Sequence, residues 1–271
     1  MPSEIEINRV VDGLCFMDDD FFAVVFDGTI KELTVILRVL LGQDDIEVRT
    51  VRTQYEIRNL EGRSVRLDAL VQDADGREFN VEIQRDDSGA LPKRARYHAS
   101  MMDARLIRKG TTYKQLPESY VIFITENDIF HGGRSHYIIQ RDILELNEVF
   151  YDEQHNIYVN AQIKDGSAIS ELMQDFKMTD YREIHDPELA GLMKQFKETE
   201  GGRKKMCEAV RQYGLQCAAE AREEAREEGI QEGIQKGISI CKLKEKGFSA
   251  EQIADLLDMP LVQVNAYTIQ L

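Results

Sequence analysis

The segment that most constrains the fold is RLDALVQDADGREFNVEIQR, residues 66–85. Apolar and polar residues alternate on both sides of Ala74-Asp75-Gly76, which is typical of two β-strands joined by a tight turn. If these three residues form the hairpin loop, facing residues have numbers that sum to 150, and Asp68 lies opposite Glu82. The register is well determined, because a slip of one residue would exchange the two faces.

The two faces of this hairpin differ in chemistry. The apolar face is expected to hold Leu67, Ala69, Val71, Phe79, Val81 and Ile83. The other face is expected to hold Arg66, Asp68, Leu70, Gln72, Glu78, Asn80, Glu82 and Gln84. Two carboxylates that face one another across a hairpin repel unless a positive charge lies between them. A divalent metal ion would supply that charge, and so would Arg66 on a solvated strand face, so the spacing alone leaves both interpretations open.

The elements around the hairpin predict a fold with both helices and strands. Up to residue 125 we expect a helix over 20–41 that is interrupted near Gly28, three antiparallel strands over 46–54, 64–72 and 78–85, a helix over 91–108 and a strand over 119–125. Pro92 suits the first turn of the second helix. The continuous apolar run SYVIFIT predicts that the last of these strands is buried on both faces.

The rest of the chain is expected to be mostly helical. We predict short strands over 137–139 and 157–161, helices over 168–178 and 187–198, and a long charged helical tail after Gly201-Gly202. The adjacent glycines indicate a boundary, because they maximise backbone freedom. Within the tail, Gly229, Gly233 and Gly237 recur every four residues, although each interior glycine costs a helix about 1 kcal/mol relative to alanine. This spacing indicates either a close partner helix in a homo-oligomer or a weak, hinge-prone helix.

Residues 248–271 resemble a helix-turn-helix. Ser249 and Gln252 are spaced as a capping box, and Asp258-Met259-Pro260 predicts a turn before a second helix. That second helix has no Lys or Arg, which favours a small packing module over a helix that reads a DNA groove, although Gln263 and Asn265 could contact bases.

The charge distribution is uneven. The formal net charge is −15, which argues against a protein that coats DNA non-specifically, because such binding requires cations at the phosphates. The basic residues between positions 93 and 109 are nevertheless Lys93, Arg94, Arg96, Arg105, Arg108 and Lys109, with Asp103 as the single acid. This run is either a solvated helix face or a surface for phosphates.

Several protein classes are not favoured. No run approaches the roughly 18 apolar residues that span a bilayer, and residues 1–10 lack a basic region followed by an apolar stretch, so we expect a cytoplasmic protein without a membrane partner. Cys15, Cys207, Cys217 and Cys241 are far apart and are expected to be reduced thiols. His131 and His136 are expected to be ordinary surface or loop residues. Sequence motifs of NTPases, α/β-hydrolases and zinc proteases are absent.

The ordered set of motifs resembles a known family. Asp68 followed by Glu82-Ile83-Gln84 is similar to the D…(D/E)-x-K signature of the PD-(D/E)XK nuclease superfamily. The segments VEIQR, KRARYHASMMD, KGTTYKQL and YVIFIT, and the tail EEGIQEGIQKG, resemble successive landmarks of its recombination-promoting nuclease and transposase group. The resemblance covers roughly residues 15–165 and the tail. It implies an α/β (α+β type) restriction-endonuclease-like core, with a central mixed sheet flanked by helices, plus a helical C-terminal tail.

The resemblance also implies functional residues. Asp68 and Glu82 would bind Mg²⁺ or Mn²⁺, and the backbone carbonyl of Ile83 would be a further ligand. Asp20 is a candidate for an accessory acid. The candidates for contact with DNA are Arg85, Lys93, Arg94 and Arg96.

One residue departs from the superfamily signature. Gln84 occupies the lysine position, and an amide can orient a water or a phosphate oxygen but brings no positive charge. The sequence leaves open whether Arg85, Lys93 or Arg94 supplies the missing charge.

These observations predict a divalent-metal-dependent DNA endonuclease associated with recombination or mobile elements. The alternative is a catalytically silent oligomeric module that carries a remnant nuclease site and binds DNA or protein through its oligomeric tail. The predicted organisation is a nuclease-like domain over 1–165, a helical extension over 166–200, an oligomerisation helix over 201–247 and a helix-turn-helix-like module over 248–271.

Overall fold

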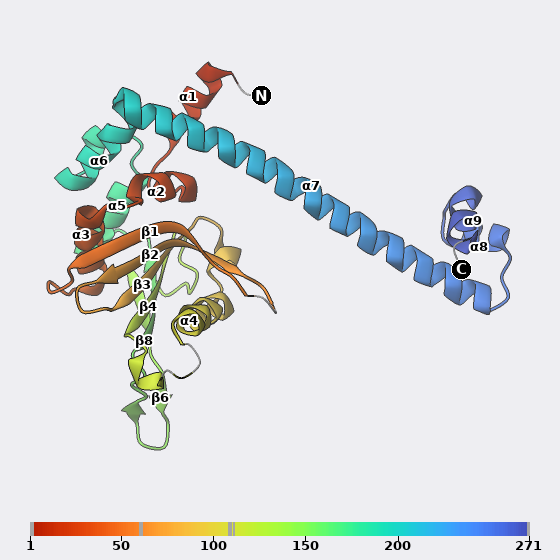
Figure 1. The fold of residues 1–271 in the computed structure, drawn as a ribbon, viewed down its shortest axis with the longest axis horizontal. Coiled ribbons are helices and arrows are strands. Elements are labelled where there is room, and N and C mark those ends of the chain that lie inside the picture. The colour runs from red at the N-terminus through yellow and green to blue at the C-terminus, as the bar shows by residue number, and fades with distance from the viewer. Residues whose placement is uncertain (1–2, 60–61, 108–109, 111, 270–271) are drawn as a thin grey trace. The chain divides into compact units, whose positions relative to one another are not determined.

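The computed structural model describes residues 3–59, 62–107, 110 and 112–269. The chain forms two compact units, residues 1–211 and 212–271, which are taken separately here (Figure 1). The predicted division into four segments is finer than this and stays a prediction. None of the described helices is both long enough and apolar enough to span a bilayer.

The first unit is built on a mixed six-stranded sheet with the order β1-β2-β3-β4-β8-β5. Its strands are β1 (Val48–Ile57), β2 (Val65–Asp73), β3 (Glu78–Gln84), β4 (Ser119–Thr125), β5 (His136–Ile139) and β8 (Gln154–Asn160). Strands β1, β2 and β3 are antiparallel, β3, β4 and β8 are parallel, and β5 is antiparallel to β8. A separate two-stranded ribbon pairs β6 (Asp142–Ile143) with β7 (Glu148–Val149). This mixed sheet flanked by helices is the restriction-endonuclease-like core that was predicted.

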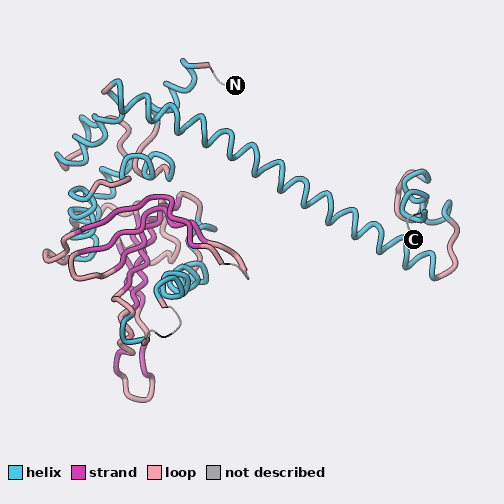
Figure 2. Tube along the Cα trace, in the orientation of Figure 1, coloured by secondary structure: helices cyan, strands magenta, loops and turns pink. Residues whose placement is uncertain are grey.

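Helices cover both faces of the sheet (Figures 1 and 2). Helix α4 (Pro92–Leu106) packs on one face through Ala95, Ala99 and Met102. The helices whose residues join the hydrophobic core on the other face are α1 (Glu4–Gly13), α2 (Asp19–Phe26), α3 (Ile30–Leu41), α5 (Ala168–Lys177), α6 (Pro187–Glu198) and the start of α7 (Glu200–Glu245). Strand β4 is buried along its whole length between these layers, as predicted.

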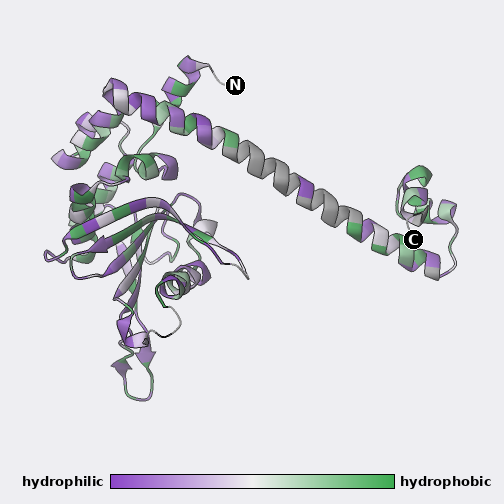
Figure 3. Cartoon of the chain, viewed as in Figure 1, coloured by the Kyte–Doolittle hydropathy of each residue, from purple (hydrophilic) through white to green (hydrophobic). Residues whose placement is uncertain are grey.

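The predicted helix over 20–41 is two helices. The break falls at Gly28, which has a φ of 73°, and helix α3 ends at Gly42 in the same left-handed region. Glycine adopts this conformation without a steric penalty. Helix α4 begins with Pro92 in its first turn as predicted, and much of its length is hydrophilic in Figure 3. Arg108, which was expected at its end, and Lys109 lie outside the described residues.

The hairpin register follows the prediction. Ala69 pairs with Val81 and Leu70 with Asn80, so facing numbers sum to 150. The backbone N–H of Asp73 donates to the carbonyl of Arg77 at 3.1 Å and closes the three-residue loop. Asp68 and Glu82 are the next pair in this register.

Strand β2 changes face at Asp68. Ala69 packs in the core beneath α2 and α3, whereas Leu67 packs with Leu70 against α4. The prediction that Leu67 shares a face with Ala69 is therefore wrong. The β1–β2 register places Gln54 opposite Asp68, and Gln54 has a left-handed φ of 49°, which is uncommon for a residue other than glycine. Such local irregularities reorient side chains and are frequent beside active sites.

Of the two glycines at the start of the tail, Gly202 has a packing role. Helix α7 (Glu200–Glu245) begins one residue after Thr199 and includes Gly201 and Gly202. A Cβ on Gly202 would lie 2.2 Å from the carbonyl oxygen of Gln195 in α6, so this glycine permits close backbone approach. The 3-10 helices η2 (Tyr113–Gln115) and η3 (Tyr181–Glu183) complete the described helices of the first unit, together with η1 (Asp87–Ala90).

The second unit contains most of α7, from residue 212 onward, with α8 (Ala250–Leu256) and α9 (Leu261–Ile269). Ile240, Ile253 and Val264 form its small core, and the predicted capping box of Ser249 and Gln252 is present. A Cβ on Gly237 would lie 3.5 Å from the ring of Tyr267 in α9. This glycine is therefore covered by its own chain, whereas the side-chain surroundings of positions 229 and 233 lie outside the described part.

Candidate active site

Asp68 and Glu82 come together at the point where β2 changes face. The Oδ2 atom of Asp68 accepts a hydrogen bond from the backbone N–H of Ile83 at 2.9 Å. The backbone N–H of Asp68 in turn donates to Oε1 of Glu82 at 3.3 Å. Asp68 is 8% exposed and Glu82 is 0% exposed. The hairpin therefore holds two neighbouring carboxyl groups in a largely water-free place, with backbone hydrogen bonds that fix their orientation.

Burial raises the pKa of Asp68 well above its ordinary value, and the nearby Glu82 carboxylate raises it further. The hydrogen bond from Ile83 and the charge of Arg94 act in the opposite direction. A bound cation would relieve both the desolvation and the repulsion. Because Mg²⁺ is typically held by one or two carboxylates together with water and phosphate oxygens, this pair fits such a metal. Among the described residues there is no group of three or more His, Cys, Asp or Glu side chains arranged for a metal.

Arg94 is the cation that contacts the acid pair. It lies in the first turn of α4, and its Nη2 is 3.1 Å from Oε2 of Glu82. Its Nη1 donates to Oε1 of Gln84 at 3.3 Å and to the carbonyl of Gly89 at 2.8 Å. The guanidinium carbon also lies 5.8 Å from the centre of the Phe123 ring. Arg94, predicted as a contact for the DNA backbone, is thus part of the site itself.

Arg66 does not neutralise the pair of Asp68 and Glu82, which was one of the two interpretations of the sequence. Its side chain is exposed, and its charge lowers the pKa of Asp20. Strand β2 changes face at Asp68, which accounts for the difference, because Arg66 lies on the far side of that change. In the described structure, the basic side chains within 4 Å of Glu82 are Arg94 and His98.

His98 and Asn80 complete the surroundings of Glu82, and neither was assigned a role from the sequence. Nδ1 of the buried His98 lies 3.4 Å from Oε1 of Glu82 and 3.1 Å from Nδ2 of Asn80. Nε of Arg94 donates to Nε2 of His98 at 3.3 Å. The sequence feature that could have indicated His98 is its four-residue spacing from Arg94, which places both residues on one face of a helix. The Oδ1 atom of Asn80 is buried and has no hydrogen-bond partner in the described structure.

Helix α2 brings further acids toward the pair. Asp19 is among the charges that raise the pKa of Asp68. The pKa of Asp20 itself is raised to about 7, first by burial and then by Asp19 and Asp18. Asp20, the predicted accessory acid, therefore lies in the first turn of α2 beside Asp19, whose charge raises the pKa of Asp68.

The other predicted DNA contacts are placed differently. Arg85 forms ion pairs with Asp18 and Glu126. Lys93 and Arg96 are exposed on α4, and in the described part of the chain neither forms an ion pair. The side chains of Lys93 and Arg96 are therefore open to solvent, whereas Arg85 is already paired with acidic residues.

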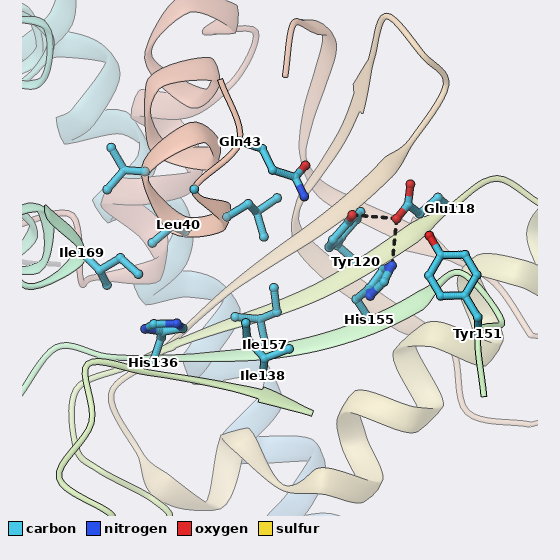
Figure 4. Close-up of a pocket in the computed structure, with 13 residues that line it drawn as sticks. Leu40, Gln43, Glu118, Tyr120, His136, Ile138, Tyr151, His155, Ile157 and Ile169 are labelled. Carbon is cyan, nitrogen blue, oxygen red and sulfur yellow. Dashed lines mark hydrogen bonds and ion pairs between the residues drawn. The ribbon is translucent and has the colours of Figure 1, made fainter. Parts of the chain in front are cut away.

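A cavity of about 410 Å³ lies on the sheet face opposite α4 (Figure 4). Its lining includes Tyr120, Ile157 and Ile169, which belong to the core on that face. In it, Oε1 of Glu118 accepts from the Tyr120 hydroxyl at 2.8 Å and lies 2.9 Å from Nε2 of His155. The cavity is therefore separate from the acid pair. His131 and His136 are exposed, as predicted for surface or loop residues.

Comparison with known proteins identifies one family. The family model described as PD-(D/E)XK nuclease family transposase matches residues 32–199, which is more than half of the chain. The matched region contains Asp68, Glu82, Gln84 and the whole of α4, but not Asp20 or the tail. No curated protein and no solved structure shows significant similarity to the chain.

Proposed function

The chain belongs to the PD-(D/E)XK nuclease family transposases, and on this basis we propose that it is a DNA endonuclease that depends on Mg²⁺ or Mn²⁺. The reaction adds water across one P–O ester bond of the DNA backbone, so that one end carries the phosphate and the other a hydroxyl. We further propose that this cleavage serves recombination or mobile elements, in keeping with the family's description as transposases.

The observation that carries the proposal is the geometry of Asp68 and Glu82. Two acids that share one buried site, with one pKa raised by burial and by the other acid, are typical of functional centres. A purely structural ion-pair network would pair both acids with cations. In the described structure the contacts from Arg94 and His98 are to Glu82, whereas Asp68 accepts a backbone hydrogen bond from Ile83.

Asp68 and Glu82 would hold the metal, with the backbone carbonyl of Ile83 as a third oxygen ligand. When bound, the metal would lower the pKa of a coordinated water and stabilise negative charge on the scissile phosphate. Asp20, half-buried and with a raised pKa, would act as an accessory acid near the pair.

The substrate would approach along α4. Lys93 and Arg96 are exposed on this helix and would contact backbone phosphates. Contacts of this kind position DNA without reading its sequence, and each phosphate contact contributes to a salt-dependent affinity. The net charge of −15 would confine DNA binding to such local basic surfaces.

The test compares two glutamates of the same strand. Glu82→Gln removes one carboxylate of the acid pair, whereas Glu78→Gln removes another buried carboxylate of β3, which is paired with Arg105. We expect duplex cleavage in Mg²⁺ or Mn²⁺ by wild type and by Glu78→Gln, and none by Glu82→Gln. Equal cleavage by Glu82→Gln and wild type would refute the assignment.

One observation favours the alternative of a catalytically silent binding module. Glu82 is 0% exposed and is already paired with Arg94, while Gln84 brings no charge. In that case wild type would bind duplex DNA or a protein without cutting DNA in either metal, and Glu82→Gln would leave binding unchanged.

Homo-oligomerisation through the glycine-punctuated helix is a separate proposal, supported by the spacing of Gly229 and Gly233, whereas Gly237 packs against Tyr267 of its own chain. Light scattering on full-length protein and on a chain truncated after Arg211, where the first unit ends, tests it. A smaller assembly after truncation would support the proposal, and an unchanged assembly would refute it.

A further inference from the structure

The position of the signature lysine is occupied by Gln84, so the proposed nuclease lacks one positive charge at that strand position. We propose that Arg94 supplies this charge to the scissile phosphate from helix α4, and that Gln84 and Gly89 hold its guanidinium in place. This inference rests on the proposed nuclease function and assigns a catalytic role to Arg94.

The guanidinium of Arg94 lies between two residues of the signature. Nη2 lies 3.1 Å from Oε2 of Glu82, and Nη1 lies 3.3 Å from Oε1 of Gln84. Arg94 therefore bridges the second acid of the signature and the residue that replaces the lysine. The positive charge of Arg94 on α4 is therefore close to position 84 at the end of β3, where the signature lysine would supply its charge.

The two other candidates for the charge are placed elsewhere. Arg85 donates to Asp18 and Glu126, so its guanidinium is turned toward those acids. Lys93 is exposed and makes no ion pair in the described structure. The sequence left these three residues as alternatives, and the contacts favour Arg94.

Gly89 makes room for this arrangement. It lies in the 3-10 helix η1, and its carbonyl accepts from Nη1 of Arg94 at 2.8 Å. A Cβ on residue 89 would lie 1.8 Å from Oε1 of Gln84 and 3.4 Å from Nη1 of Arg94. Any side chain at this position would therefore displace the Gln84 amide from the guanidinium.

The hydrogen bonds of Arg94 leave capacity for a ligand. A guanidinium has five N–H groups. Contacts to Glu82, Gln84, Gly89 and His98 use four of them in the described structure, which leaves one N–H on Nη2. The Arg94 side chain is 36% exposed, although Glu82 behind it is fully buried. An arriving phosphate would meet this exposed side of the guanidinium.

The chemistry of arginine defines the role. Arginine side chains are permanent cations in proteins, so this residue type does not act as a general base. Its contribution would be electrostatic stabilisation of negative charge on the phosphate oxygens, from a position fixed before the reaction begins. Removing one such fixed donor typically lowers kcat by about 10²–10³-fold.

A charge-relocation experiment tests the inference. Single variants Arg94→Ala and Arg94→Lys are compared with the double variant Arg94→Ala/Gln84→Lys, which moves the charge to the signature position. Arg105→Ala is the matched control, because Arg105 is an arginine of the same helix that pairs with another buried glutamate of β3, Glu78. Two quantities are measured: kcat for cleavage of a duplex in Mn²⁺, and affinity for the same duplex in EDTA. Thermal unfolding confirms that each variant is folded, and Arg94→Lys keeps the charge should Arg94→Ala unfold.

We expect Arg94→Ala to lower kcat by about 100-fold or more while duplex affinity falls by less than about 10-fold. The double variant should recover at least about a tenth of the wild-type kcat, and folded Arg105→Ala should keep the wild-type kcat and affinity. Wild-type kcat in Arg94→Ala, with cleavage still lost in Glu82→Gln, would overturn this inference and leave the nuclease assignment intact. An inactive double variant would also overturn it. No cleavage by wild type in either metal would overturn the nuclease function and the inference together.

Discussion

The carboxylate of Asp68 accepts a hydrogen bond from the backbone N–H of Ile83 at 2.9 Å, which ties the first acid of the site to the residue that follows the second. This bond orients the carboxylate, but it does not remove the unfavourable burial of its charge. The pKa of Asp68 is raised by burial and by Glu82 in spite of it. The buried acid pair is therefore expected to lower the stability of the metal-free protein.

Asp68→Asn should stabilise the protein in EDTA at pH 7.5. The asparagine Oδ1 can still accept from Ile83, and the repulsion with Glu82 disappears. We expect a gain of about 0.5–2 kcal/mol in the free energy of unfolding, as is common when strain at an active site is removed. Urea denaturation measures it. Asp73→Asn is the control with the opposite sign, because Asp73 lies on the same strand and is buried against Arg77. A loss of stability in both variants would contradict the account of Asp68.

A divalent metal should stabilise the wild type and not the variants of the acid pair. A ligand that binds only the folded state adds about 2.7 kcal/mol to stability at 100 times its Kd. We therefore expect Mn²⁺ to raise the Tm of wild type relative to EDTA, and to leave the Tm of Glu82→Gln and Asp68→Asn unchanged. This readout does not depend on cleavage. Equal shifts in all three proteins would place metal binding elsewhere on the chain.

Asp20 should make stability depend on pH. Its pKa is raised to about 7 in the folded protein, against an ordinary value of 3.8. Between these values the folded state keeps a proton that the unfolded state has lost, so stability falls as pH rises from about 4 to about 7. The Asp20→Asn variant has no carboxyl group at this position, so its stability should not fall for this reason. The difference in unfolding free energy between variant and wild type should be small at pH 4 and should reach its full size, in favour of the variant, by pH 8. Urea titrations at these two pH values measure it, and a difference that does not change with pH would contradict the raised pKa.

Gly89→Ala should separate cleavage from folding. The added Cβ collides with the end of the flexible Gln84 side chain, which can move away, so Tm should change little. The displaced amide no longer orients Arg94, and we expect kcat to fall by about 10-fold or more, since misplacement of a reacting group by about 1 Å can cost 10²-fold. Gly76→Ala offers a contrast, because the left-handed φ of 85° strains the turn and should lower Tm instead. A wild-type kcat in folded Gly89→Ala would show that the position of Gln84 is not needed.

Much of this site could be predicted from the hairpin sequence. Alternation of apolar and polar residues in β3, together with the three-residue turn, predicted the register of β2 and β3, and therefore the pairing of Asp68 with Glu82. The change of face at Asp68 could not be predicted, because it coincides with a left-handed Gln54 on the neighbouring strand, and nothing in the local sequence requires that conformation. Leu67 was assigned to the wrong face for this reason.

The partners of Glu82 were harder to predict. Arg94 and His98 reach it across a tertiary contact between α4 and β3, and the sequence gives the spacing of the two residues but not the side of the sheet on which the helix packs. The basic composition of α4 drew attention to DNA contacts, although the structure directs Arg94 and Arg105 toward buried carboxylates of β3. Among the described residues of the run, Lys93 and Arg96 are exposed and are the candidates for contacts with the DNA backbone, in addition to the proposed contact of Arg94 with the scissile phosphate.

The central claim is that Asp68 and Glu82 form a metal-dependent nuclease site, and cleavage of supercoiled plasmid tests it most directly. Wild type and Asp68→Ala are each incubated with Mg²⁺, Mn²⁺ or EDTA, and the nicked and linear products are quantified. The account predicts nicking by wild type in at least one of the two metals, none in EDTA and none by Asp68→Ala in any condition. Equal nicking by Asp68→Ala, or an intact plasmid with wild type in both metals, would contradict it.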